Sequence, residues 1–136
     1  MILDVLAVAG GGALGALLRF ALLRREEGRA ERAPSAWDPA ARATFTANVG
    51  GCALFGLWGA AAVSGRFGDV PPTEFGAALD LFVLTGLCGG WTTFSTVIAD
   101  GVRLGSEQNS RSAFIYAAST LVAGILALWI GLRVAE

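Results

Sequence analysis

Four long apolar segments, each close to the length that crosses a lipid bilayer, constrain this 136-residue chain more than any other feature. They cover residues 3–23, 43–63, 77–102 and 113–132. A helix needs about 20 residues to span a hydrocarbon core of about 30 Å. None of the segments shows the alternating pattern of a barrel strand. The sequence therefore predicts an all-α membrane protein with four transmembrane helices in a single domain, residues 1–136.

The composition excludes several classes of function. Charged residues make up 15% of the chain, against about 25% in soluble domains. The chain has no histidine, and all ten cationic residues are arginine. A histidine general base and a histidine-ligated metal are therefore excluded, and we expect no enzyme. Cys52 and Cys88 both lie in apolar segments, which favours buried thiols over a disulfide.

The arginines are distributed unevenly between the two ends of the predicted helices. The connections after the first and third segments carry seven: Arg24, Arg25, Arg29, Arg32, Arg42, Arg103 and Arg111. The opposite side carries only Arg66 and Arg133. Because cytoplasmic loops are enriched in cations, we expect a multi-pass protein of the cell membrane with both termini outside the cytoplasm. Asp4 and the lack of a basic start favour a first membrane helix over a secretory signal.

The third segment contains an unusual run near its middle, GGWTTFST at residues 89–96. Glycine costs a helix about 1 kcal/mol relative to alanine. We therefore predict that this helix is broken near the membrane midplane, where freed backbone groups bind ions in transport proteins. Close helix packing is the alternative role for these glycines, because Gly86 and Gly90 form a GxxxG pair, as do Gly11 and Gly15.

Hydrogen-bond donors also mark the other segments, with Arg19 on the first, Asn48 on the second, and Tyr116 and Thr120 on the fourth. Each has a simpler alternative role. Arg19 can snorkel to the interface, Asn48 can bond between helices, and hydroxyls can bond to their own helix backbone.

Together these donors favour a path for a small anion. We expect no carboxylate at the centre of the membrane, because Asp80 and Asp100 fall near the ends of the third segment. A proton-coupled cation exporter would require a carboxylate there. The ring edge of Phe94 is electropositive and adds to the anion-binding character.

Three motifs together resemble the Fluc (CrcB) family of fluoride channels: GGALGALLRF at 11–20, TFTANVGG at 44–51 and GLCGGWTTFST at 86–96. The resemblance implies two four-helix subunits in an antiparallel, dual-topology dimer that exports fluoride passively from the cytoplasm. It implies a structural sodium ion held by the backbone carbonyls of Gly89 and Thr92. It also implies a set of residues along the fluoride pore: Arg19, Asn48, Thr93, Phe94, Ser95, Thr96, Tyr116 and Thr120.

The chain departs from the family pattern at three positions. Val97 replaces a second phenylalanine, and its spacing from Phe94 predicts a shared helical face with one aromatic ring missing. Asp100 stands where glutamate is common, and Gly124 where serine is common.

The arginine bias also bears on assembly. A chain that inserts in both orientations has nearly balanced loops, so the bias predicts one fixed orientation. An antiparallel dimer then requires a second, related subunit of opposite orientation. We therefore expect a heterodimer, with a homodimer as the alternative.

Two other functions are alternatives to a fluoride channel. A small multidrug exporter would carry a membrane-embedded glutamate in its first helix, whereas Arg19 is the only charge deep in that segment. A non-conducting partner subunit fits the GxxxG faces and the incomplete phenylalanine pattern.

Overall fold

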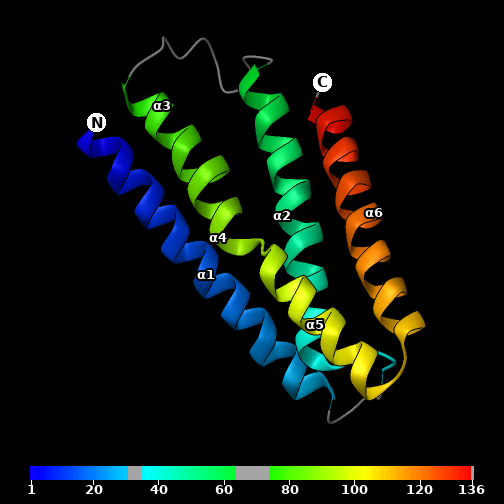
Figure 1. Ribbon diagram of the computed structural model, residues 1–136. Coiled ribbons are helices and arrows are strands. Elements are labelled where there is room, and N and C mark those ends of the chain that lie inside the picture. The colour runs from blue at the N-terminus through cyan, green and yellow to red at the C-terminus, as the bar shows by residue number, and fades with distance from the viewer. Residues whose placement is uncertain (31–34, 64–73, 136) are drawn as a thin grey trace.

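The computed structural model describes residues 1–30, 35–63 and 74–135. Within these residues, four helical spans are long and apolar enough to cross a membrane, as the sequence predicts. Both chain termini lie at the same end of the helix bundle (Figure 1). Two of the arginines that were counted for the predicted orientation lie outside the described residues, Arg32 and Arg66.

The first two helices, α1 (Ile2–Ala30) and α2 (Pro39–Val63), are longer than the apolar segments. Residues beyond Leu23 stay helical because arginine and glutamate are good helix formers. The end of α1 is also tied to α2. The Nε atom of Arg42 lies 3.0 Å from a carboxylate oxygen of Glu26, and both side chains are largely buried. Asp38 caps α2 by accepting the backbone N–H groups of Ala40 and Ala41, with proline at the first helical position.

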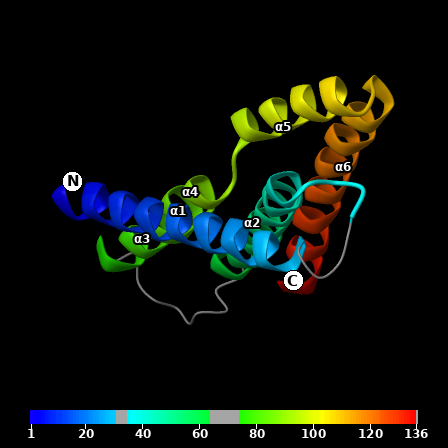
Figure 2. The same cartoon turned by 90° about the horizontal axis from the view of Figure 1, so that it is seen from below.

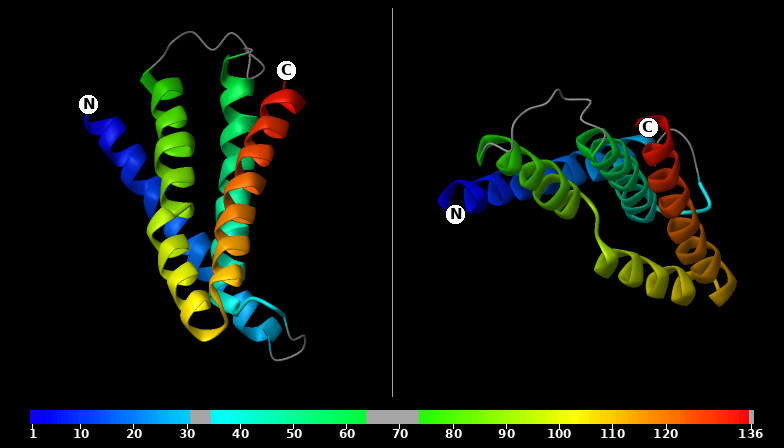
Figure 3. Two further views of the ribbon diagram at one scale, coloured as in Figure 1. Left: turned by 45° about the vertical axis from the view of Figure 1, so that its right-hand side comes forward. Right: turned by 90° about the horizontal axis from the view of Figure 1, so that it is seen from above.

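The third span consists of four consecutive pieces: α3 (Glu74–Asp80), the π-helix η1 (Leu81–Cys88), α4 (Gly89–Trp91) and α5 (Phe94–Glu107). Thr92 and Thr93 lie between α4 and α5 with extended backbone angles, φ −79° and ψ 157°, and φ −156° and ψ 127°. As a result α5 does not continue the line of α4 but is displaced sideways (Figures 2 and 3).

Glycines allow α1 and the third span to touch backbone to backbone. A Cβ atom on Gly86 would lie 2.8 Å from the Val8 carbonyl oxygen, and one on Gly15 would lie 2.6 Å from the Trp91 nitrogen. Cβ atoms on Gly11 and Gly90 would likewise collide with backbone atoms of the facing helix. The two GxxxG pairs therefore serve the close packing that was their alternative role.

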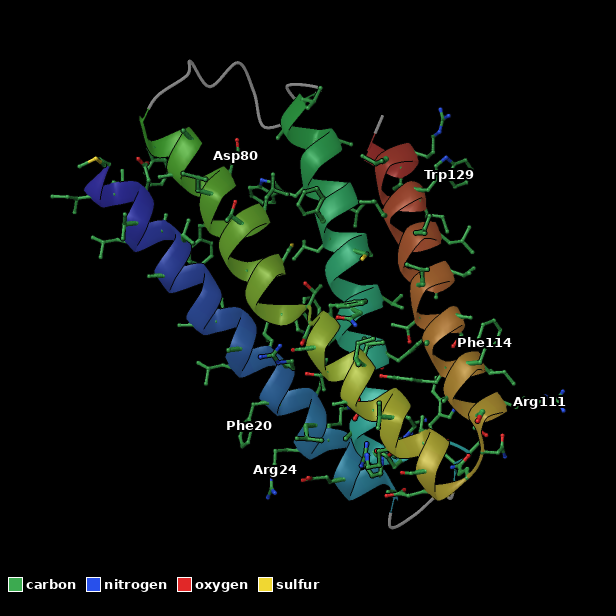
Figure 4. The ribbon with its side chains drawn as sticks, viewed as in Figure 1. Phe20, Arg24, Asp80, Arg111, Phe114 and Trp129 are labelled. Atoms are coloured by element: carbon green, nitrogen blue, oxygen red, sulfur yellow. The ribbon has the colours of Figure 1, made fainter. Side chains whose placement is uncertain are left out.

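The last helix, α6 (Ser110–Ala135), packs along α2. Four buried residues form the main apolar core between α2, α5 and α6: Ala41, Val97, Leu104 and Tyr116, with Trp37 and Phe45 packed against them. Most other large apolar side chains are exposed. Phe20 and Phe114 point away from the bundle, as expected of a chain surrounded by lipid or a partner (Figure 4). Cys52 and Cys88 are both free thiols, as expected.

Candidate functional site

Asn48 joins α2 directly to the junction between α4 and α5. Its side-chain amide nitrogen donates to the Thr93 carbonyl oxygen at 3.0 Å, and its amide oxygen accepts the Thr93 N–H at 2.7 Å. This pair of bonds satisfies both backbone groups of an extended residue that no helix satisfies. One hydrogen of the Asn48 amide is used in this contact, which leaves the second as a donor.

Three hydroxyl groups gather at the start of α5. The Thr93 Oγ1 atom caps the helix by accepting the Thr96 N–H at 3.3 Å. The same oxygen lies 3.2 Å from the Ser95 hydroxyl and 3.0 Å from the Thr96 hydroxyl. Together with Asn48, these residues form what we call the junction cluster. It is rich in hydrogen-bond donors and lies at the positive end of a 14-residue helix.

The carbonyls of Gly89 and Thr92 lie on the other side of the same junction. The usual helical donor to the Gly89 carbonyl is the N–H four residues on, at Thr93, which donates to Asn48 instead. Gly89 is exposed, and an added Cβ atom there would meet no atom of another element within 4 Å. The Thr92 carbonyl accepts a long hydrogen bond of 3.4 Å from the Arg19 guanidinium. Arg19 therefore points into the bundle toward the junction.

Phe94 and Val97 lie three residues apart on α5, but their surroundings differ. The Phe94 side chain is 79% exposed, whereas Val97 is 7% exposed and belongs to the core with Tyr116. Positions three apart on a helix differ by about 60° in direction, and here that angle separates the outer surface from the core.

Tyr116 and Thr120 lie apart from the junction cluster, inside the packing of α2, α5 and α6. The Tyr116 side chain is fully buried, and its hydroxyl donates to Asp100 at 3.3 Å. The Thr120 hydroxyl donates to the Tyr116 carbonyl at 2.8 Å, which is the backbone bonding within one helix that was its alternative role. Gly124 approaches α2, where an added Cβ atom would lie 3.4 Å from the Cys52 sulfur.

Asp100 is a functional candidate that sequence reasoning overlooked. We expected it near the end of a helix, but it lies in the middle of α5 and is 5% exposed. Its carboxylate accepts from the Thr44 hydroxyl at 2.8 Å and from Arg103 at 2.8 Å, in addition to Tyr116. The spacing of Asp100 and Arg103, three residues apart, was the available signal for a paired charge.

Comparison with known proteins bears directly on this arrangement. The family model described as "CrcB-like protein, Camphor Resistance (CrcB)" matches residues 6–132, which include Arg19, Asn48, the junction and Tyr116. The chain belongs to this CrcB family.

Relatives of this CrcB chain match it over nearly its whole length. A protein of Azotobacter vinelandii named "Fluoride-specific ion channel FluC" is 38% identical over 138 residues, covering 97% of this chain and 96% of its own. A protein of the same name from Stutzerimonas stutzeri is 35% identical and covers 100% of this chain and 99% of its own. "Fluoride-specific ion channel FluC 2" of Rhodococcus jostii is 32% identical, covering 96% of this chain and 97% of its own.

Proposed function

We propose that this CrcB chain is a subunit of a fluoride channel that lets fluoride leave the cytoplasm down its gradient across the cell membrane. The observation that carries the proposal is the junction cluster. It presents the free Asn48 amide hydrogen and the hydroxyls of Thr93, Ser95 and Thr96 beside the start of a long helix. Near-complete matches to proteins named fluoride-specific ion channels support the same conclusion.

The chemistry of the cluster favours a small anion. Hydroxyl and amide donors can replace the water that an anion loses, and the first N–H groups of α5 add positive potential. Arg19 contributes a full positive charge close to the junction. We propose that the extended Thr92 and Thr93 lie at the membrane midplane. Irregular backbone at that depth must be hydrogen-bonded by protein or line a cavity, and Asn48 bonds both backbone groups of Thr93.

A second subunit completes the proposed pore. Phe94 is adjacent to the junction cluster and largely exposed, so its ring is available to a partner and to an anion passing its electropositive edge. We propose an antiparallel dimer with pores along the interface, each lined by the junction cluster and Phe94. Tyr116 and Thr120 stay candidates for the pore, reached only if the packing around Asp100 opens.

We also propose a structural sodium ion between the two subunits. The Gly89 and Thr92 carbonyls are neutral oxygen donors of the kind that hard cations prefer, and Gly89 is exposed. Two carbonyls are fewer than the six or more oxygens that such a cation takes, so the second subunit would supply others. The bound ion would hold the subunits together. Arg19 already donates to the Thr92 carbonyl, so the sodium would share that oxygen.

The direct test of the proposed function is fluoride efflux from liposomes, followed with a fluoride electrode. We expect efflux from the wild type and at least a tenfold loss in Phe94→Ile, because isoleucine keeps an apolar side chain and removes the positive ring edge. Phe114→Ile is the matched control, since Phe114 is also exposed but lies near the start of α6, away from the junction. Equal efflux from both variants would contradict the proposed pore.

Sodium removal should lower efflux without any fixed ratio of sodium to fluoride. Replacing sodium with N-methyl-D-glucamine on both sides of the membrane takes away the ion that we propose joins the subunits. Size-exclusion chromatography should then show a shift toward the monomer. Fluoride flux that is driven by an imposed sodium gradient would contradict a purely structural role.

The arginine bias predicts a fixed orientation and a heterodimer. Numbered names such as FluC 2 in Rhodococcus jostii and Brucella abortus are consistent with organisms that carry two such chains. A reporter that is active only in the cytoplasm should be silent when fused to the C-terminus. Stable, fluoride-conducting dimers made from this chain alone would contradict the heterodimer.

A further inference from the structure

Asp100 is a buried carboxylate that accepts hydrogen bonds from three side chains. Thr44 of α2 and Tyr116 of α6 donate to one oxygen at 2.8 and 3.3 Å. Arg103, one turn along α5, donates to the other at 2.8 Å. Thr44 and Tyr116 are buried and donate through neutral hydroxyls, so among these donors Arg103 brings the positive charge to this carboxylate.

Arg103 is itself held in place by a second carboxylate. The same Nη2 atom lies 2.9 Å from both oxygens of Asp38, the residue that caps α2. The charged and titratable groups that face Asp100 are therefore Arg103 on α5, Asp38 before α2 and Tyr116 on α6, with Thr44 adding a neutral hydroxyl from α2. Asp38 is further stabilised by the N–H groups at the start of α2.

The group holds two carboxylates and one cation, so Arg103 offsets only part of its negative charge. Asp100 is 5% exposed, and removing Arg103 leaves its charge with less compensation in a medium of low polarity. In a protein that passes anions, an uncompensated carboxylate inside the bundle also raises the energy of an anion nearby. Asp100 contacts Tyr116, which family resemblance assigns to the pore and which is fully buried here. Asp100 also lies on α5, the helix that carries Phe94 and the hydroxyls of the junction cluster.

We propose that Arg103 is a positioning residue for anion passage: it clamps Asp100 against α2 and α6 and offsets its charge, so that this carboxylate opposes fluoride less. This inference rests on the proposed channel function. It concerns a residue outside the junction cluster, and it assigns the Asp38–Arg103–Asp100 group to the function and not only to the fold.

The test compares four variants of the full chain, with its partner subunit where one is required, in liposomes: Arg103→Gln, Arg103→Lys, Asp100→Asn, and the double variant Arg103→Gln/Asp100→Asn. Arg103→Gln should lower fluoride efflux at least tenfold at neutral pH. The double variant should restore efflux at neutral pH, and Arg103→Lys should keep most of the flux.

Arg111→Gln is the matched control, because it removes the same charge from an exposed residue at the same end of the bundle that points away from it (Figure 4). It should conduct like the wild type. A loss in Arg103→Gln that is not rescued by adding Asp100→Asn would show a merely structural role and overturn the inference. Unchanged efflux in Arg103→Gln would overturn it as well.

Thermal unfolding in detergent separates this inference from the proposed function. Arg103→Gln should be less stable than the wild type at neutral pH, whereas the double variant should recover much of that loss. If the wild type carries no fluoride, the channel proposal fails, and the anion-passage role fails with it. If the wild type conducts but the unfolding profiles of the single and double variants coincide, Arg103 does not compensate Asp100.

Discussion

Replacing Asn48 with aspartate is expected to reduce fluoride efflux about a hundredfold, the largest functional effect of any single substitution that the geometry supports. The new carboxylate would still accept the Thr93 N–H, which now lies 2.7 Å from the Asn48 oxygen. It could not donate to the Thr93 carbonyl, which now receives the amide at 3.0 Å. Two oxygens without a proton between them would face each other at the junction.

Two effects of Asn48→Asp both lower fluoride efflux. The unpaired Thr93 carbonyl costs about 1–3 kcal/mol, and the added negative charge repels an anion where it sheds water. Stopped-flow or electrode measurement of efflux from liposomes reads both. Thr46→Ala is the control on the same helix, because the exposed Thr46 hydroxyl bonds only to the Arg42 carbonyl one turn back among the described residues. Efflux from Asn48→Asp within twofold of the wild type would rule out the junction cluster as the pore.

Gly15→Ala is expected to have the largest effect on folding. Its Cβ atom would lie 2.6 Å from the Trp91 nitrogen and would also collide with the Leu87 carbonyl oxygen. Overpacking a protein interior costs about 1–3 kcal/mol. Here the neighbours are backbone atoms of another helix and cannot rotate away, so we expect the loss to reach about 3 kcal/mol or more.

A glycine on another helix provides the control for Gly15→Ala. Gly59→Ala adds the same methyl group on α2, where no atom lies within 4 Å, and it should leave the free energy of unfolding unchanged or slightly raised. Monodisperse yield and thermal unfolding in detergent compare the two variants. Equal stability of Gly15→Ala and Gly59→Ala would mean that α1 and η1 are not in backbone contact.

Much of this architecture could be predicted from apolar segment lengths and a few motifs. The four spans follow from the requirement for about 20 apolar residues, and the run at residues 89–96 marks where helical structure stops between α4 and α5. Helix ends were less predictable. Hydropathy detects where lipid contact stops, whereas α1 continues to Ala30 through charged residues that favour helix.

The sequence could not predict which residues of α5, the helix after the junction, are buried and which are exposed. Two extended residues change the direction in which α5 leaves the junction, and no periodicity in the sequence records the size of that change. Which side of α5 faces the core could therefore not be predicted: Val97 lies in the core while Phe94 is exposed, and Asp100, expected near a helix end, lies inside. Asn48 was predicted as a polar site. Its hydrogen bonds to the Thr93 backbone could not be predicted, because the two residues are 45 positions apart in the chain.

The two sides of the junction are held by different kinds of contact, and this difference has an evolutionary consequence. Where α1 meets η1 and α4, glycine faces backbone, and no larger residue on one helix can be offset by a smaller one on the other. Where α5 meets α2, the contacts are between side chains such as Asp38, Arg103 and Thr44, which can be exchanged in compensating pairs. Related chains should therefore diverge by paired substitutions around α5, while the face between α1 and η1 changes little.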